Sequence, residues 1–271
     1  MIYTLGIDIG STTSKCILMS DGKEIIAKSI YRAGAGTGGA EHAFNDILVK
    51  SNISRSDIDY IVATGYGRTI FEAADHQLSE LSCHAKGVFS QFPEVRTIID
   101  IGGQDAKVIN LNKNGIIDSF LMNDKCAAGT GRFLEVMSKI LQIDISEMEE
   151  YAAESDQPIQ ISNTCTVFAE SEVISQLAKG EATSDIVAGI CSSVAGRVAS
   201  LAKRGKVHSK TYMSGGVARN AGVRNALSKV LETEIIYSKH SQYMGAMGAA
   251  IAGFEMWNKN VNKEVCYSER S

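Results

Sequence analysis

The sequence predicts a mixed α/β protein that contains two related domains with a cleft between them. Apolar runs typical of strands are interspersed with amphipathic stretches that have helical spacing. One strand–turn–strand pattern occurs twice, beginning near residues 5 and 98, which indicates that a domain has been duplicated. No linker rich in Pro, Ser or Gly separates the two copies, so we expect the domains to pack closely.

The duplicated pattern is an apolar strand that contains an aspartate and leads into a polar turn and a lysine. In the first copy Lys15 lies seven residues after Asp8, and in the second Lys107 has the same spacing from Asp100. Each copy continues into a second apolar run and a Gly-containing turn, which predicts a β-meander. The first domain is assigned to residues 1–95, completed by a C-terminal helix at 245–271, and the second domain to residues 96–244.

Helices are expected between and after the two meanders. A late strand at 211–214 ends in a glycine pair, and the polar tail after Trp257 is expected to fray. Apolar residues at helical spacing predict helices in four segments, which are 41–49, 130–141, 168–177 and 186–201, and a helix rich in small residues is expected at 245–257.

Composition and charge argue against nucleic-acid and membrane partners. The net charge of −4 provides no basic surface for nucleic acid. The N-terminus has neither the basic segment nor the cleavage site of a signal peptide, and no uninterrupted apolar run reaches the roughly 18 residues of a membrane span. We therefore expect a cytoplasmic protein whose six cysteines are reduced and serve as core residues, metal ligands or catalytic groups.

The two aspartate turns suit a phosphate group together with a divalent cation. Glycine lets backbone N–H groups approach phosphate oxygens, the hydroxyls of residues 11–13 donate hydrogen bonds, and Lys15 supplies a cation. The carboxylate of Asp8 is suited to hold Mg²⁺ directly or through water. A single Asp-x-Gly turn is common in plain β-turns, but two copies in matching frames and a later Gly-Gly pair are more specific for nucleotide binding.

Four longer segments resemble a known family. They are residues 63–68 (ATGYGR), 79–85 (SELSCHA), 123–133 (NDKCAAGTGRF) and 165–174 (CTVFAESEVI). With the aspartate turns they resemble the activator, component A, of 2-hydroxyacyl-CoA dehydratases, which is related to the ATPase subunits of benzoyl-CoA reductase (the BadF/BadG family). The resemblance extends from residue 1 to about residue 255. It implies the actin/Hsp70/sugar-kinase superfold, in which two ribonuclease-H-like domains bind a nucleotide in the cleft between them.

The resemblance also implies a role for each matching residue in binding ATP or ADP and Mg²⁺. Asp8 and Asp100 would position Mg²⁺ and its waters, and either Gln104 or Asp105 would orient the attacking water. The segment 65–67 matches a further nucleotide-binding segment, for which a surface turn is the alternative. The triphosphate would be bound on one side by Ser11, Thr12, Thr13, Ser14 and Lys15, and on the other by Gly102, Gly103 and Gln104. The adenosine would lie against Gly215, Gly216, Val217 and Gln242, with Gly129, Thr130, Gly131 and Arg132 nearby, and the 65–67 segment contributes Gly65, Tyr66 and Gly67.

Two cysteines stand out because each precedes an amphipathic stretch. Helix N-termini carry partial positive charge, which stabilises thiolates such as those of Cys126 and Cys165. Spacing alone leaves open that both cysteines fill space in the core. A [4Fe–4S] cluster normally takes four thiolates, which two identical chains supply if each gives two across a two-fold axis. The resemblance implies this arrangement, with one [4Fe–4S] cluster per homodimer, and the other cysteines, Cys16, Cys83, Cys191 and Cys266, are interpreted as non-ligands.

The function implied by the resemblance is ATP-dependent transfer of one electron from the cluster to a 2-hydroxyacyl-CoA dehydratase. A reduced ferredoxin or flavodoxin would supply the electron. Three alternatives remain open from the residues alone: a small-molecule kinase of the same superfold, which needs a carboxylate base beside an acceptor hydroxyl; a nucleotide-dependent switch or chaperone; and an ATPase whose cysteines are structural. Iron and sulfide in anaerobically purified protein would distinguish the activator from all three.

Overall fold

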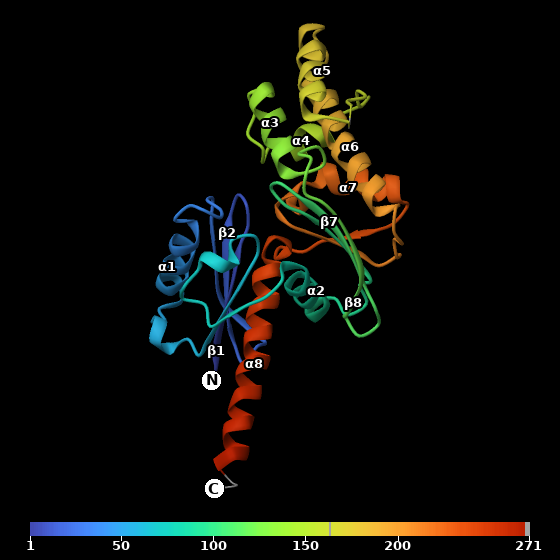
Figure 1. Ribbon diagram of the computed structural model, residues 1–271. Coiled ribbons are helices and arrows are strands. Elements are labelled where there is room, and N and C mark those ends of the chain that lie inside the picture. Colours follow the sequence, from blue (N-terminus) through green and yellow to red (C-terminus); the bar gives the residue numbers. More distant parts are fainter. Residues whose placement is uncertain (163, 269–271) are drawn as a thin grey trace. The chain divides into compact units, whose positions relative to one another are not determined.

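The computed structural model describes residues 1–162 and 164–268, with side chains described as far as residue 261 (Figure 1). The chain forms two compact units. Unit 1 consists of residues 1–93 and the C-terminal segment from Tyr243, and unit 2 consists of Glu94–Gln242. Each unit contains one five-stranded sheet of mixed strand direction together with helices, which confirms the predicted α/β class.

The sheet of unit 1 has the strand order β3-β2-β1-β4-β5. The predicted meander is formed by the antiparallel strands β1 (Tyr3–Ile9), β2 (Ser14–Ser20) and β3 (Glu24–Tyr31). Parallel pairing then adds β4 (Tyr60–Thr64) to β1 and β5 (His76–Gln77) to β4. The aspartate turn therefore lies at the edge of the sheet where β1 and β4 both end.

The two faces of β1 pack against different helices because successive side chains alternate across a strand. On one face, the hydroxyl of Thr4 donates a hydrogen bond to the carbonyl of Ala250 in α8 (Met244–Ser268) at 3.0 Å. On the other, α1 (Gly39–Ser51) packs against the buried core, and Figure 1 shows α1 and α8 on opposite sides of the sheet. The β1 residues that share this buried core with α1 are Leu5, Ile7 and Ile9.

The helix α8 approaches its neighbours at positions where only glycine leaves room. A Cβ on Gly248 would overlap with the carbonyl oxygen of Cys83 in α2 (Glu80–Gln91), and a Cβ on Gly6 would overlap with that of Ala246. At both contacts a neighbouring backbone carbonyl occupies the space that a Cβ would need, so only glycine fits.

The structure continues α8 to Ser268, so the expectation of fraying directly after Trp257 was wrong. A helix that is already nucleated by packing extends at little cost.

Unit 2 repeats the meander in a sheet with the order β10-β9-β6-β7-β8. The antiparallel strands β6 (Thr97–Ile101), β7 (Ala106–Leu111) and β8 (Ile117–Asn123) correspond to the second predicted copy. The late strand β9 (Thr211–Ser214) pairs in parallel with β6, and β10 (Ile235–Ile236) pairs in parallel with β9.

Five helices share one continuous apolar core with this sheet. Figure 1 shows them gathered together beside the β6–β9 strands. The helices predicted at 130–141, 168–177 and 186–201 are confirmed, whereas the remaining two were not predicted. The five helices are α3 (Gly131–Leu141), α4 (Met148–Ala153), α5 (Thr166–Ala178), α6 (Thr183–Ala202) and α7 (Ala221–Leu231). Short 3-10 turns occupy Arg55–Asp57, Arg68–Ile70, Gly216–Arg219 and Ser241–Tyr243.

One helix of the described part of the chain, α6, is long and apolar enough by length and composition to cross a membrane. Its most apolar window has a mean hydropathy of 1.3, and 72% of that window is buried inside the protein. Buried residues recur around much of its circumference, which is the pattern of a central core helix.

The glycine contact of α8 with α2 yields a stability prediction. The change Gly248→Ala should lower the free energy of unfolding by about 1–3 kcal/mol, because the α2 backbone would have to move away from the new methyl group. Urea unfolding measures the effect. Gly253→Ala is the matched control on the same helix, since its Cβ would meet only side-chain atoms at 3.2 Å or more. Equal losses in the two variants would contradict the close-contact explanation.

Candidate functional site

The first aspartate turn joins β1 to β2 in unit 1. Asp8 and Lys15 face each other across the ladder, both largely buried, and Lys15 Nζ lies 3.1 Å from Asp8 Oδ2. The N–H of Gly10 donates to the carbonyl of Thr13 at 3.0 Å and closes the turn. Within residues 1–162 and 164–268, no hydrogen bond to Asp8 Oδ1 is found, which leaves this oxygen suited to a cation or its water.

The hydroxyl groups of the first turn differ in their availability. Ser11, Thr12 and Thr13 lie half-buried in the loop between β1 and β2. The hydroxyl of Ser14 is instead buried and donates to the carbonyl of Ala33 at 2.9 Å. Phosphate binding by Ser14 would therefore require this hydrogen bond to break.

The second aspartate turn, in unit 2, has the same backbone geometry but a different set of charges. The N–H of Gly102 donates to the carbonyl of Asp105 at 2.9 Å. Lys107 is buried, with Nζ 2.6 Å from Asp105 Oδ2 and 3.6 Å from Asp100 Oδ2, and Ser214 Oγ donates to Asp100 Oδ1 at 2.7 Å. Both oxygens of Asp100 thus interact with protein groups, whereas Asp8 has one such oxygen.

A glycine beside each aspartate extends the internal repeat beyond the meanders. Gly65 follows β4 with φ +87°, and Gly215 follows β9 with φ +86°, a region of φ that favours glycine. A Cβ on Gly65 would lie 2.5 Å from Asp8 Oδ1, and one on Gly215 would lie 3.0 Å from Asp100 Oδ1. The segment 65–67 therefore occupies in unit 1 the place that residues 215–217 occupy in unit 2. This contact with the aspartate turn argues against an isolated surface turn.

The start of α3 lies on the second turn. The N–H groups of Gly131 and Arg132 donate to the carbonyls of Gly102 and Gly103, each at 2.9 Å. The two preceding residues lie elsewhere: the hydroxyl of Thr130 donates to a carbonyl within its own loop. Gly129 packs against the stem of Arg197 in α6. Of the four residues predicted near the adenosine in this loop, two therefore contact the turn and two do not.

The other predicted adenosine residues gather beside the same turn. The N–H of Gly215 donates to the carbonyl of Ser241 at 3.1 Å, which brings the segment before Tyr243 against the glycine pair. A Cβ on Gly216 would lie 3.5 Å from Gln242 Nε2, and one on Gly131 would lie 3.5 Å from Val217 Cγ2. The structure thus brings these residues together in unit 2, and their contact with a nucleotide stays a prediction.

His84 is a neighbour of Asp8 that the sequence reasoning missed. It lies on α2, is buried, and its Nε2 is 2.9 Å from the position that a Cβ of Gly245 would occupy. Asp8 Oδ2 is 3.0 Å from the same position. The only signal in the sequence was the pair of residues 83–84, which was interpreted as structural.

The two cysteines interpreted as ligands are both half-buried in unit 2. Cys165 is the N-cap of α5, as predicted. Cys126 precedes α3 as predicted, but it lies in the loop between β8 and α3, four residues before the N-cap Thr130. Between Cys126 and Thr130, Gly129 adopts a positive φ of +86°. The side-chain amide of Asn123 donates to the carbonyl of Cys126 at 3.1 Å and holds this part of the loop.

Three further cysteines are buried and unsuited to bind a metal. Burial raises the pKa of Cys83 and of Cys191 to about 12, and it raises the pKa of the fully buried Cys16 well above the usual range. Their thiols are therefore protonated at neutral pH, whereas metals bind the thiolate. Cys266 lies beyond the residues whose side chains are described.

No complete metal site is present in one chain over the part that the structure describes. Within residues 1–162 and 164–261, no three His, Cys, Asp or Glu side chains are close enough together to hold a metal ion. Two half-buried thiols in one unit are half of the donor set that a [4Fe–4S] cluster normally takes. The residues present therefore fit a cluster that a second chain completes.

Comparison with known proteins relates this architecture to ATPases. Residues 5–253 match the BadF/BadG/BcrA/BcrD ATPase family. The (R)-2-hydroxyglutaryl-CoA dehydratase activating ATPase of Acidaminococcus fermentans is 53% identical over 255 residues, which are 94% of this chain and 98% of that protein.

Solved structures agree with this match. The activator of the 2-hydroxyisocaproyl-CoA dehydratase from Clostridium difficile, with bound ADPNP, has a TM-score of 0.95 and 50% identity, covering 97% of this chain and 98% of that one. A glucokinase of the ROK family from Streptomyces griseus has a TM-score of 0.56 at 13% identity, covering 93% and 99% of the two chains. The second likeness shows the fold alone, which is that of the actin and sugar-kinase ATPases.

The glycine pair after β9 yields a prediction about nucleotide binding. Gly216→Val should weaken ATP binding by roughly tenfold or more, because the new methyl groups would occupy space that the adenosine needs. The free energy of unfolding should change by less than about 1 kcal/mol, since only Gln242 lies nearby. Titration with ATP and urea unfolding measure the two quantities.

Gly215→Val provides the contrast, because its Cβ would overlap with the carbonyl oxygen of Ile101 and its φ is positive. This variant should lose stability as well as nucleotide binding. Unchanged ATP affinity in folded Gly216→Val would contradict the adenosine assignment.

Proposed function

The chain is a member of the BadF/BadG/BcrA/BcrD ATPase family, and from this premise we propose that it activates a 2-hydroxyacyl-CoA dehydratase by ATP-dependent transfer of one electron. The observation that carries the proposal is the pair of half-buried cysteines in a chain that is 53% identical to one dehydratase activator and 50% identical to another. These two relatives are named for different acyl-CoA substrates, so the dehydratase partner, and not the activator, would select the substrate. A small-molecule kinase of this fold shares only 13% identity with the chain.

In the proposed reaction the electron comes from a reduced ferredoxin or flavodoxin. A [4Fe–4S] cluster, when bound, would take up one electron and release it to the dehydratase, which is thereby reduced by one electron. One ATP with one water gives ADP and phosphate as the step that makes the transfer directional. We propose a cytoplasmic location for the protein and its two electron partners.

Cys126 and Cys165 are the proposed ligands of this cluster. Cys165 begins α5, so its thiolate would lie at the positive end of the helix, and Asn123 fixes the backbone at Cys126. With two thiolates per chain, a homodimer would supply four.

An exposed apolar stripe on α5 supports the homodimer. Val167 and Phe168, in the first turn of α5 after Cys165 and Thr166, are 66% and 64% exposed, and Ile174 is 51% exposed about two turns further along the helix. The opposite side of α5 carries the buried Ala169. An apolar helix face that its own unit leaves uncovered, beside half of a metal site, suits a second copy of the chain.

The residues around the two aspartates would divide the work of ATP hydrolysis. Asp8 would hold Mg²⁺ or its waters, because its Oδ1 has no hydrogen bond within the described residues. Asp105 is paired with Lys107 at 2.6 Å, whereas the side chain of Gln104 is exposed. Of the two residues that the sequence left open, we therefore propose Gln104 to orient the attacking water.

A short segment of unit 2 would connect the nucleotide to the cluster. Gly131 and Arg132 hydrogen-bond to the second turn, and Cys126 lies in the loop that leads into them. ATP influences the cluster only insofar as it binds one conformation of the protein better than another. We propose that a shift of the turn between ATP-bound and ADP-bound states moves this loop.

The shared cluster is tested by breaking the dimer. Ile174→Asp should give a monomer that lacks iron, because a charge in the buried interface costs several kcal/mol and each chain keeps only two thiolates. Light scattering and iron analysis under anaerobic conditions measure both quantities, and the wild type should hold about four irons per dimer. Val230→Asp, at an exposed apolar position of α7, should keep the dimer and the iron. A monomeric Ile174→Asp that keeps all its iron would rule out the shared cluster.

Cysteine variants test the ligands within the same assay. Cys165→Ala should abolish iron binding, whereas Cys16→Ala should retain it because Cys16 is fully buried in unit 1. Iron retained in full by Cys165→Ala would show that the ligands are assigned wrongly.

The coupling of ATP to electron transfer is tested at Asp8. Asp8→Asn removes the charge but nearly keeps the shape, so ATP hydrolysis should fall on the order of a hundredfold while the fold and the iron content remain. The variant should accept an electron from a strong chemical reductant yet fail to activate a dehydratase. Asp46→Asn, which removes an exposed carboxylate paired with Lys50 on α1, is the matched control. Full activation by a variant that no longer hydrolyses ATP would break the proposed coupling.

A further inference from the structure

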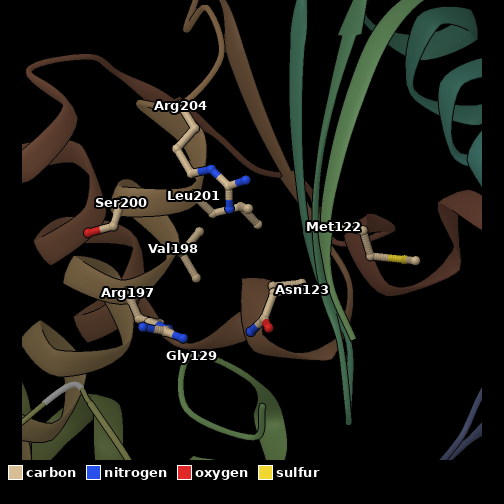
Figure 2. A pocket seen from close by; sticks show the side chains of 9 residues that line it. Met122, Asn123, Gly129, Arg197, Val198, Ser200, Leu201 and Arg204 are labelled. Atoms are coloured by element: carbon tan, nitrogen blue, oxygen red, sulfur yellow. The ribbon is translucent and has the colours of Figure 1, made fainter. Parts of the chain in front are cut away.

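A cavity of about 190 Å³ lies between the C-terminal half of α6 and the sheet edge formed by β8 (Figure 2). Val198 and Leu201 of α6 form the apolar part of its wall, and Asn123 and Gly129 contribute from the end of β8 and the loop that follows. The remaining polar wall is formed by two arginines of α6. All of these residues belong to unit 2, and the proposed nucleotide-binding residues are not among them, except Gly129.

The two arginines, Arg197 and Arg204, lie on the same side of α6. They are seven residues apart, or about 10.5 Å along the helix axis. Figure 2 shows both guanidinium groups directed toward the space between α6 and Asn123. Among the side chains of residues 1–162 and 164–261, no hydrogen bond or ion pair to either guanidinium is found, and no Asp or Glu is among the described residues that line the cavity. Two neighbouring cations without a carboxylate partner favour an anionic ligand.

The position of Arg197 is built into the local backbone. A Cβ on Gly129 would lie 2.8 Å from Arg197 Cγ and 3.1 Å from its Cβ, so glycine at this position makes room for the arginine stem. Gly129 also has a positive φ, which few other residues adopt. The packing restricts Arg197 before any ligand binds, which lowers the entropy cost of binding.

The surroundings of Arg204 add positive charge. Lys203 precedes it, and Lys206 and Lys210 follow it in the chain. A Cβ on Gly205 would lie 3.3 Å from Leu121 of β8, so this basic segment passes close to the strand that borders the cavity. Burial and the positive charges of Lys206 and Arg96 lower the pKa of His208, against the opposing charge of Asp118 on β8. Such positive charges attract anions and raise their local concentration.

We propose that this cavity binds the phosphate group of a small molecule between Arg197 and Arg204, with the amide of Asn123 as a further donor. Each guanidinium presents a fork of N–H groups that matches phosphate oxygens, and a phosphate dianion balances both charges. A single carboxylate would balance only one of them. The ligand is either inorganic phosphate, a product of the ATPase reaction, or a phosphate monoester small enough for the cavity.

The cavity adjoins the loop that carries Cys126. Asn123, which lines the cavity, also donates to the carbonyl of Cys126, and Gly129 of the same loop supports Arg197. A ligand held by these residues therefore restricts the loop from both of its ends. This restriction of the loop does not depend on whether the cysteines bind a cluster.

The test is calorimetric titration of sodium phosphate into the full-length protein at constant ionic strength. Saturating Mg·ADPNP fills the nucleotide site, so that phosphate cannot bind there. The wild type should show saturable binding, and Arg204→Gln and Arg197→Gln should each weaken it by roughly tenfold or more. Lys229→Gln, which removes one exposed cation from α7 of the same unit, should bind phosphate as the wild type does. Arg204 is exposed, so its variant keeps the test valid even if Arg197→Gln fails to fold.

Amide hydrogen exchange supplies a second measurement. Phosphate should slow exchange in residues 123–130 of the wild type and of Lys229→Gln, but not of Arg204→Gln. Absence of saturable binding, equal binding in all variants, or equally tight binding of acetate would each overturn the proposal. Tighter binding of glycerol 3-phosphate than of phosphate would support a monoester as the ligand, and the reverse order would support inorganic phosphate.

Discussion

Each unit is organised around a buried carboxylate at the end of its first strand. Asp8 and Asp100 are almost fully buried, and a buried charge is tolerated only when it is paired and hydrogen-bonded. The lysine opposite each aspartate supplies the pair, which explains the fixed spacing of the two residues in both copies. The adjacent strand must then end in glycine, because Gly65 and Gly215 lie where any Cβ would press against the carboxylate or the strand end. In each copy the aspartate, the lysine and the glycine pack together as one cluster. The residues predicted to bind the nucleotide lie around this cluster.

The two copies share this frame but differ in how much of the carboxylate the protein itself engages. Asp100 is held by Ser214 and Lys107, and Lys107 is also held by Asp105. Asp8 is paired with Lys15 through Oδ2, and no hydrogen bond to its Oδ1 is found among the side chains that the structure describes. A carboxylate with engaged oxygens stabilises the turn, whereas one with an available oxygen suits a cation. The two copies therefore differ in the protein partners of their carboxylates, and the turn of unit 1 is the one we propose for the cation.

The sequence predicted those parts of the fold that large apolar residues mark at regular spacing. Both meanders and the helices α3, α5 and α6 follow such patterns, and the aspartate turns were identified because their spacing repeats. The helix α2 was not predicted, because its contact with α8 is made by Gly87, Cys83 and Gly248 instead of large apolar side chains. The sequence also could not predict why residue 129 is a glycine. The reason is Arg197, which is distant in sequence and packs against Gly129 only in the folded chain.

The loop between β8 and α3 joins three features that the sequence presents separately. Its C-terminal end hydrogen-bonds to the second aspartate turn through Gly131 and Arg132. Its N-terminal end, at Asn123, holds the backbone of Cys126, and Gly129 between them rests on α6. A backbone fixed at both ends and supported in the middle has few ways to move, so a displacement of the turn must be taken up at Cys126 or at Arg197. The same short segment therefore connects the second aspartate turn with Cys126 and with the arginine cavity.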